Sequence, residues 1–284
     1  MTNKNTIWDR FLSPIVRSLI DEEKLRQFYE SIDWENEGDR FRQADLVYPQ
    51  YYVSQNFHGI DKGYLNPGAA VSYDPITRYV LPPQENWVRT EVIAAIKGQP
   101  QRILDLGCGT GSTTLMLKQA FPQAEVRGLD LSPYMLFMAD YKAQQAGLEI
   151  NWHHGKAETT GFAADSFDVV TASLLFHETP PQVSQLILKE CFHLLKAGGQ
   201  LVILDGNQAM LRSATWLTEI FEEPYIKAYA EGSVDAWSGA AGFGAVQTEN
   251  FWLIHQITSA VKPLAIQEQE QVRENFNEQQ EAVR

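Results

Sequence analysis

ILDLGCGTG, residues 103–111, is the stretch of sequence that decides the fold. Its first four residues are mostly apolar and predict the end of a buried strand. Glycines then occupy alternate positions, where the lack of a Cβ atom lets the backbone turn tightly and lets a ligand approach. A helix that begins near Ser112 would point its N-terminal N–H groups at that ligand. The stretch therefore predicts a strand, a ligand-binding turn and a helix in succession.

The spacing of the glycines narrows the choice of ligand. Such a turn suits NAD, FAD or S-adenosylmethionine, but the dinucleotide pattern G-x-G-x-x-G needs glycine where this chain has Ser112. Asp130 lies 19 residues beyond Gly111, at the end of the next strand-like run. A carboxylate in that place can accept hydrogen bonds from both hydroxyls of a ribose. The pattern favours an adenosyl ligand other than a dinucleotide.

Strand-like and helix-like runs alternate around this turn. The strand-like runs cover residues 101–106, 124–131, 148–154, 167–176 and 200–206, and the helix-like runs cover 113–121, 133–145 and 181–195. The last of these helices is expected to stop at Gly198-Gly199, because glycine commonly ends a helix. A further helix around 213–229 and two closely spaced strands, 244–252 and 253–262, predict an antiparallel end to the sheet.

Short apolar strands separated by helices pair in parallel, with helices on both faces of the sheet. The predicted fold is therefore α/β: a doubly wound, mostly parallel, seven-stranded sheet with an N-terminal helical and aromatic lid segment. We expect this segment over residues 1–88, of which the part after residue 45 is aromatic and turn-rich. The ligand-binding domain is expected over 89–262, followed by a polar Gln/Glu-rich tail over 263–284.

Composition excludes several classes of function. The 284 residues include 23 Lys and Arg against 36 Asp and Glu, a net charge of −13 that works against binding nucleic acid or an anionic membrane. Two cysteines supply neither a disulfide framework nor a four-ligand zinc site, and no metal is expected. Neither a secretory signal nor an apolar run of membrane-spanning length is present in the sequence. We expect a cytoplasmic protein, monomeric or homodimeric, that handles small molecules.

The ordered motifs carry a family resemblance. ILDLGCGTG with LDLSPYML, then GKAETTGFAADSFDVV, SLLFHE and LKAGGQLVILD, resembles the class I, seven-stranded S-adenosylmethionine-dependent methyltransferases over about residues 100–206. Within this family, the motifs are most similar to those of the small-molecule branch that includes the quinone-biosynthesis methyltransferases. The resemblance implies methyl transfer from S-adenosylmethionine, with S-adenosylhomocysteine as product.

The resemblance also implies which residues bind the cofactor. The turn would lie under the methionine part and the ribose, Asp130 would bind the ribose diol, and Leu131 would lie against the adenine. The full set implied is Asp105, Gly107, Gly109, Gly111, Asp130, Leu131, Ala157, Glu158, Ser173 and Tyr73. One position departs from the family, because Lys156 stands where many relatives have an acid that accepts from the adenine amino group. Lysine cannot accept a hydrogen bond, so Glu158 or backbone groups would take over.

Two histidines are the candidate catalytic residues. His177 follows the fourth strand and faces the cleft over the carboxyl ends of the strands, where a neutral imidazole could accept a proton. His58 lies in a loop upstream of the glycine turn. Pocket lining is the other role open to His177, together with the aromatic residues Tyr52, Phe57 and Tyr64. Such side chains suit a planar, partly lipophilic acceptor such as a phenol, quinol or aromatic acid.

Two other functions remain open at this stage. An NAD(P)-dependent oxidoreductase would use the same type of turn, although Ser112 speaks against it. A non-catalytic protein of the same fold would bind S-adenosylmethionine without turnover. Binding of NADH would favour the first alternative, and turnover of any acceptor would exclude the second.

Overall fold

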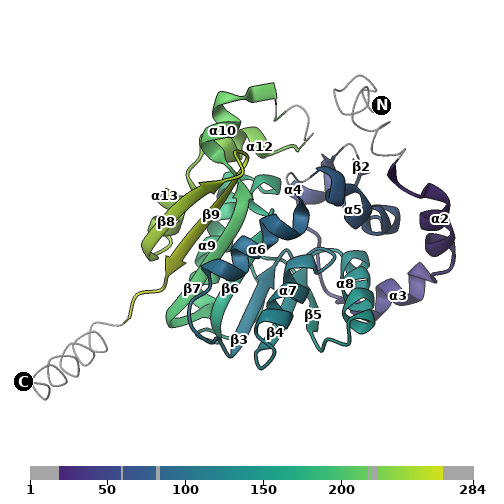
Figure 1. The fold of residues 1–284 in the computed structure, drawn as a ribbon, viewed down its shortest axis with the longest axis horizontal. Coiled ribbons are helices and arrows are strands. Elements are labelled where there is room, and N and C mark those ends of the chain that lie inside the picture. The colour runs from purple at the N-terminus through teal and green to yellow at the C-terminus, as the bar shows by residue number, and fades with distance from the viewer. Residues whose placement is uncertain (1–18, 59, 81–83, 217, 219–222, 265–284) are drawn as a thin grey trace, which may run out of the picture.

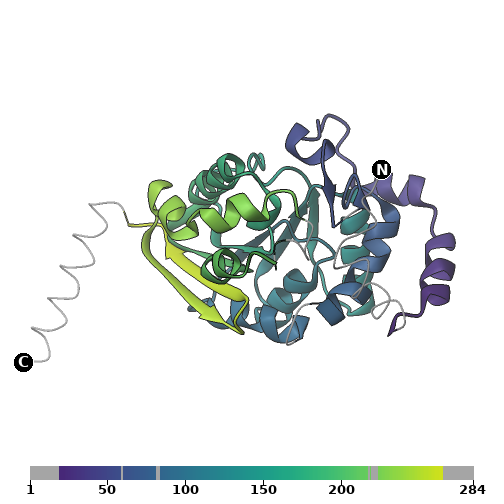
Figure 2. The same ribbon diagram turned by 90° about the horizontal axis from the view of Figure 1, so that it is seen from above.

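A seven-stranded sheet with helices on both faces forms the centre of the molecule (Figures 1 and 2). The computed structural model describes residues 19–58, 60–80, 84–216, 218 and 223–264. The order of the strands is β5-β4-β3-β6-β7-β9-β8. Their bounds are β3 (Arg102–Leu106), β4 (Glu125–Asp130), β5 (Asn151–His154), β6 (Phe167–Ser173), β7 (Leu195–Gly206), β8 (Gly244–Phe251) and β9 (His255–Val261). Strands from β5 to β7 pair in parallel, and β9 pairs antiparallel with both β7 and β8, which confirms the predicted fold.

The order of the strands reverses at β3. From β3 the chain passes through α7 (Ser112–Ala120) to β4 and through α8 (Pro133–Gln145) to β5, then returns to place β6 on the other side of β3. In open α/β sheets the crevice for a ligand lies at such a switch point, outside the carboxyl ends of the strands. The glycine turn, which directly follows β3, is at this edge.

The core lies in two layers because successive residues of β3 face opposite sides. Ile103 packs on one face with residues of α6 (Glu85–Ala95) and α7. Leu104 and Leu106 pack on the other face with α9 (Pro181–Leu194) and with residues of three short helices. These are α10 (Gln208–Ser213), α12 (Ile226–Glu231) and α13 (Val234–Ala240).

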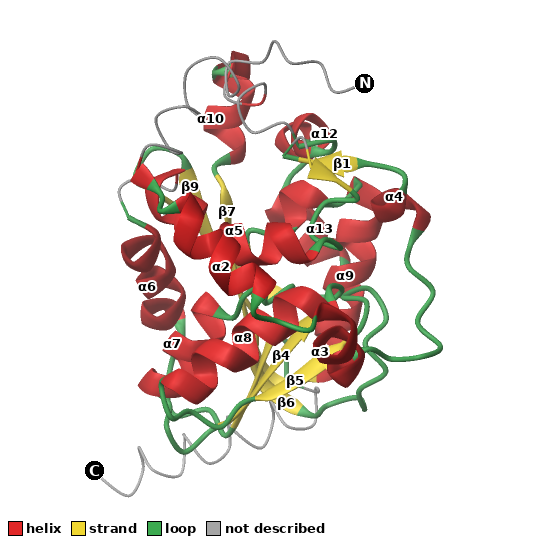
Figure 3. Cartoon of the chain, turned by 90° about the vertical axis from the view of Figure 1, so that its right-hand side faces the viewer, coloured by secondary structure: helices red, strands yellow, loops and turns green. Residues whose placement is uncertain are grey.

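The N-terminal segment packs on α8. It contains α2 (Glu22–Glu30), α3 (Trp34–Phe41), α4 (Gln50–Val53), α5 (Pro67–Val80) and a small hairpin of β1 (Asn56–Phe57) and β2 (Ile60–Asp61). Ala70 and Val71 of α5 pack with Met135 and Met138 of α8, and α3 lies beside α8 (Figure 3). The expected boundary at residue 88 falls inside α6, whose Val88 and Val92 belong to the core of the sheet.

Three local expectations were wrong. The turn-rich interpretation of residues 46–88 missed α5, which contains Pro75 and is held by burial of Ala70 and Val71 against α8. The helix expected to stop at Gly198-Gly199 ends at Leu194, because buried Leu195 already pairs with Phe167 at the start of β7. The helix expected around 213–229 is not continuous, since α10 ends and α12 begins within that range. The expected tail lies outside the described residues from 265 onward.

The indole of Trp152 on β5 requires glycine on the neighbouring strand β4. A Cβ atom on Gly128 would lie 2.5 Å from the ring of Trp152 and 3.0 Å from Cys108 Sγ. We therefore expect Gly128→Ala to lower the free energy of unfolding by about 1–3 kcal/mol, because it overpacks a filled site. Urea unfolding measures this change.

Gly239 on α13 is the matched control, because a Cβ atom there meets nothing within 4 Å. Gly239→Ala should leave the free energy of unfolding unchanged or raise it by about 0.5–1 kcal/mol, the helix preference of alanine over glycine. Equal stability of Gly128→Ala and the parent protein would contradict the packing argument.

Candidate active site

A pocket opens at the carboxyl ends of β3, β4 and β6, beneath the N-terminal segment. Its walls come from the glycine turn, from the residues after β4 and β5, and from tyrosines of the N-terminal segment. They include Tyr52, Tyr64, Tyr73, Gly107, Gly109, Asp130, Leu131, Ala157, Glu158, Ser173 and Glu178. Most residues that the sequence suggested for the cofactor are thus brought together, and Asp105 and Gly111 are not among the lining residues.

Asp130 presents its carboxylate at the edge of the pocket. Its Oδ2 accepts a hydrogen bond from the N–H of Gly109 at 2.8 Å, and its Oδ1 accepts one from the N–H of Ser132 at 2.8 Å. Burial raises the pKa of Asp130 to about 6, although these backbone donors lower it. A carboxylate has about four acceptor sites, so Asp130 keeps capacity for two further donors. A ribose diol supplies two such donors.

Asp105 lies beneath the turn and not in the pocket. Its carboxylate accepts hydrogen bonds from the hydroxyls of Thr114 on α7 (2.6 Å) and Thr171 on β6 (2.7 Å), and burial raises its pKa. Gly111 begins α7 with φ +78°, and a Cβ atom there would lie 2.8 Å from the ring of Trp152. Asp105 and Gly111 therefore set the shape of the turn from below.

Gly107 and Gly109 form the surface of the turn that faces the pocket. Both have positive φ angles, +62° and +53°, a region that glycine adopts at little cost. A Cβ atom on Gly107 would lie 2.8 Å from the side chain of Leu175, whereas one on Gly109 would meet open space. The turn thus leaves room beside Asp130 for a ligand to approach the backbone.

Hydrogen bonds fix the N-terminal segment to the turn. Asp74 of α5 accepts from the hydroxyl of Thr110 at 2.5 Å and from Nζ of Lys142 at 2.6 Å. The hydroxyl of Tyr52 accepts from the N–H of Tyr64 at 3.0 Å, and the carbonyl of Tyr64 accepts from a hydroxyl of the sheet domain, that of Ser132, at 2.6 Å. The tyrosine wall and the turn therefore hold each other in place.

The aromatic residues do not all face the pocket. Tyr52 and Tyr64 line it as expected, but Phe57 is fully buried and stacks on Tyr52 with ring centroids 4.5 Å apart. Phe57 thus supports the wall from behind. Tyr51 also lines the pocket, and its hydroxyl donates to Glu158 at 3.3 Å.

His177 is bound to a buried carboxylate that the sequence analysis missed. Its Nδ1 lies 2.6 Å from Oδ1 of Asp205, whose carboxylate also accepts from the N–H groups of Phe176 and Gly206. Burial alone would lower the pKa of His177, but the charge and hydrogen bond of Asp205 outweigh it and raise the pKa to about 10. His177 is thus an imidazolium at neutral pH and does not line the pocket, contrary to its expected place there. The position of Asp205 at the end of an apolar strand was the available signal.

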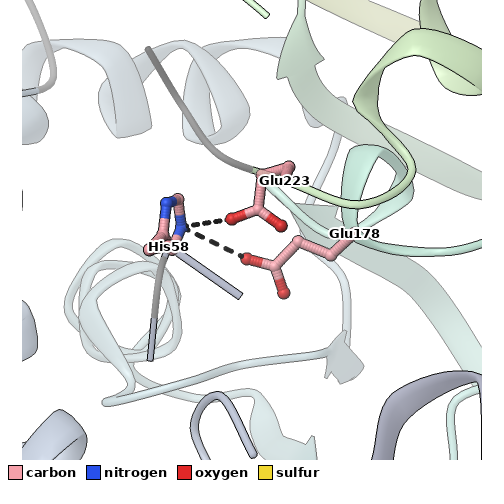
Figure 4. A group of neighbouring side chains, drawn as sticks. All are labelled: His58, Glu178 and Glu223. Atoms are coloured by element: carbon pink, nitrogen blue, oxygen red, sulfur yellow. Dashed lines mark ion pairs between the residues drawn. The ribbon is translucent and has the colours of Figure 1, made fainter. Parts of the chain in front are cut away.

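His58 lies in a cluster with two glutamates, Glu178 and Glu223 (Figure 4). His58 Nε2 is 2.5 Å from Glu223 Oε1 and 3.9 Å from Glu178 Oε1. Burial lowers the pKa of His58, but the charge and hydrogen bond of Glu223 together with the charge of Glu178 outweigh it and raise the pKa to about 9. The pKa of Glu178 is raised to about 8, because burial and the charge of Glu223 both disfavour its ionised form. Glu223 gave no signal in the sequence, because it follows another acidic residue in a stretch without a motif.

A row of hydrogen-bonded, buried polar side chains connects α6 to the pocket wall. Arg89 of α6 is almost fully buried, pairs with Glu85 at 2.9 Å and donates to the hydroxyl of Thr113 at 2.7 Å. The hydroxyl of Thr113 donates in turn to that of Ser173, which lines the pocket, at 3.1 Å. Sequence analysis missed Arg89 because a single arginine on a helix carries no motif.

Comparison with known proteins identifies the central domain. Residues 103–199 match a family model described as a methyltransferase domain. The chain is 40% identical over 119 residues to the demethylmenaquinone methyltransferase of Thermus thermophilus. This alignment covers 42% of this chain and 53% of that protein. It is 34% identical over 137 residues to the enzyme of the same name from Deinococcus radiodurans, covering 48% and 56%. The chain thus spans about half the length of the curated relatives it matches.

Solved structures agree on the fold. Human N-acetylserotonin methyltransferase, solved in complex with S-adenosylmethionine, superposes with a TM-score of 0.54 and 16% identity over 70% of this chain and 57% of that one. Residues 103–199 thus form a methyltransferase domain, and this part of the chain is similar in sequence to quinone-biosynthesis methyltransferases, in agreement with the resemblance of the ordered motifs.

Within the described residues, no helix is both long and apolar enough to cross a membrane.

The ion pair between His177 and Asp205 has a measurable consequence. In Asp205→Asn the counter-charge is lost while burial remains, so the pKa of His177 should fall from about 10 to its ordinary value of 6.5 or below. The stabilisation by this pair is present in full below pH 6.5 and is lost as the pH rises through about 10. Titration of the imidazole by NMR measures the pKa.

Asp165→Asn is the control, because the side chain of Asp165 is 61% exposed and pairs with Lys262, so this variant should leave the pKa of His177 unchanged. A pKa of His177 that stays near 10 in Asp205→Asn would show that Asp205 does not determine it.

Proposed function

We propose that this protein transfers a methyl group from S-adenosylmethionine to a small, planar or lipophilic acceptor and releases S-adenosylhomocysteine. A phenol, quinol or aromatic acid is the acceptor class that fits best. The observation that carries the proposal is the carboxylate of Asp130 beside the open turn of Gly107 and Gly109, in a pocket walled by tyrosines. The relatives named demethylmenaquinone methyltransferases support an acceptor of the quinol type.

The residues of the pocket fit the two ends of this cofactor. Asp130 would accept the ribose hydroxyls, and Leu131, Ala157 and Glu158 would hold the adenine. At the other end, Ser173 and Tyr73 would face the methionine part. When bound, the cofactor supplies an electrophilic methyl group on a sulfonium sulfur. Asp105 and Gly111, which do not line the pocket, would serve the cofactor by shaping the turn.

The N-terminal segment before α6 would serve as the lid over the acceptor. Tyr52 and Tyr64 offer flat apolar area with polar edges, which suits a planar ring, and close packing excludes water from the transfer. His58 and His177 remain the proposed catalytic histidines, although neither lines the pocket, so each would reach the acceptor only through the groups that do. Because ion pairs with Glu223 and Asp205 raise both pKa values, we propose that both histidines hold their protons at neutral pH and act as acids rather than as bases.

The net charge of −13 supports a small-molecule acceptor and speaks against nucleic acid as substrate. We propose that the protein acts in the cytoplasm as a monomer or homodimer.

Asp130→Asn tests the cofactor site. An amide cannot accept both ribose hydroxyls as a carboxylate does, so affinity for S-adenosylhomocysteine should fall by about tenfold to 100-fold, the loss of one or two charge-assisted hydrogen bonds. In the parent protein the affinity should fall as the pH is lowered through about 6, because Asp130 then takes up a proton. Calorimetric titration at several pH values measures both effects.

Asp165→Asn again serves as a control that should bind like the parent protein, since Asp165 lies outside the pocket. If Asp130→Asn binds S-adenosylhomocysteine with the parent affinity, the cofactor assignment is wrong.

The acceptor can be found with an isotope-labelled methyl donor in a metabolite extract. We expect label in a compound with an aromatic or quinol ring, identified by its gain in mass. With that acceptor, His177→Asn should lower turnover by about 100-fold, a typical contribution of one proton-handling or charged catalytic group, with little change in affinity for S-adenosylhomocysteine. Label confined to acceptors without a ring would refute the acceptor class.

A further inference from the structure

The cluster of His58, Glu178 and Glu223 joins three segments that are far apart in the sequence. His58 lies on the turn between β1 and β2, Glu178 ends the 3₁₀ helix η2 (Phe176–Glu178) after β6, and Glu223 precedes α12. One ligand atom of each residue lies within 4.8 Å of the others, and Figure 4 shows both carboxylates on the same side of the imidazole. Glu178 also lines the pocket, so the cluster borders the space proposed for the acceptor.

Within the described residues, the cluster brings two carboxylates against one imidazole. The side chain of Glu223 is completely buried, and that of Glu178 is 14% exposed. The nearby imidazole of His177 already pairs with Asp205. Two carboxylates whose oxygens lie within 4.8 Å of one another in a largely buried site repel each other. A divalent cation between them would remove this repulsion.

Glu223 provides a second, independent observation that points to a ligand. Its Oε1 contacts His58, but its Oε2 has no hydrogen-bond partner among the residues that the structure describes. A buried carboxylate oxygen without a partner is costly and is rarely found in folded proteins. Since Glu223 faces the cluster, the partner that its Oε2 lacks would lie there (Figure 4).

One imidazole nitrogen and two carboxylate oxygens form a donor set that suits Zn²⁺, Mn²⁺ or Fe²⁺. We propose that His58, Glu178 and Glu223 bind a divalent transition-metal cation of this class at the border of the pocket. Three protein ligands leave at least one coordination position for water or another oxygen. The sequence predicted no metal because its three ligands have no common motif and no regular spacing.

The metal site would change the role of His58. Binding requires neutral imidazole, so the cation would displace the proton from Nε2 and supply positive charge in its place. If the proposed function holds, the cation would favour the ionised form of a hydroxylated acceptor next to Glu178. His58 would then be a ligand rather than a group that handles the proton of the acceptor.

Zinc titration of the untagged full chain, freed of metal with a chelator, tests the site. We expect one Zn²⁺ per chain by calorimetry. Loss of an outer-shell partner commonly costs 10–100-fold in metal affinity, so loss of a ligand in Glu223→Gln or Glu178→Gln should cost about 100-fold or more. Asp165→Asn is the control, because Asp165 is exposed, pairs with Lys262 and lies outside the pocket, so the zinc affinity of this variant should equal that of the parent chain.

Binding of S-adenosylhomocysteine, measured on the same samples, separates this proposal from the proposed function. Glu223→Gln that binds S-adenosylhomocysteine normally but has lost zinc supports the metal site and shows that the variant is folded. If Glu223→Gln binds neither zinc nor S-adenosylhomocysteine, the variant is not folded. Glu178→Gln and His58→Asn then decide, by loss of zinc binding with normal binding of S-adenosylhomocysteine. No zinc uptake by the parent chain, or uptake that all three variants retain, would overturn the metal site. Zinc uptake without binding of S-adenosylhomocysteine would overturn the proposed function alone.

Discussion

The buried carboxylate of Asp105 holds together the edge of the sheet on which the pocket is built. It links the end of β3 to Thr114 on α7 and to Thr171 on β6, so three elements meet at one side chain. The glycine turn runs between two of them and has its path fixed at both ends. Asp130 then bonds to the N–H of Gly109, which ties β4 to the same turn. The geometry of the pocket depends on these two carboxylates, of which only Asp130 lines the pocket.

Regular elements could be predicted well where local pattern and tertiary packing agree. The helix at 133–145 was placed to the residue, because Pro133 fits its first turn and the Ser132 hydroxyl accepts from the N–H of Met135. Prediction failed where packing overrides local signals. Pro67, Gly68 and Pro75 resemble the residues of a turn, yet α5 forms because its small residues Ala70 and Val71 are buried against α8.

The same distinction applies to the site. Residues near the glycine turn could be found because their spacing is set by one strand–turn–helix unit and the strand beside it. Asp205 and Glu223 could not be assigned from sequence, since their partners His177 and His58 are brought to them by the fold. Phe57 was assigned to the pocket because aromatic character indicates a pocket wall and a core equally well, and its full burial decides for the core.

The fit of Trp152 against β4 and the turn constrains how the sequence can diverge. Its ring occupies the space that a Cβ atom would need at both Gly111 and Gly128. A larger residue at position 128 is therefore compatible with the fold only if position 152 becomes smaller at the same time. Related chains should show these positions changing as pairs, so that glycine at one accompanies a large ring at the other.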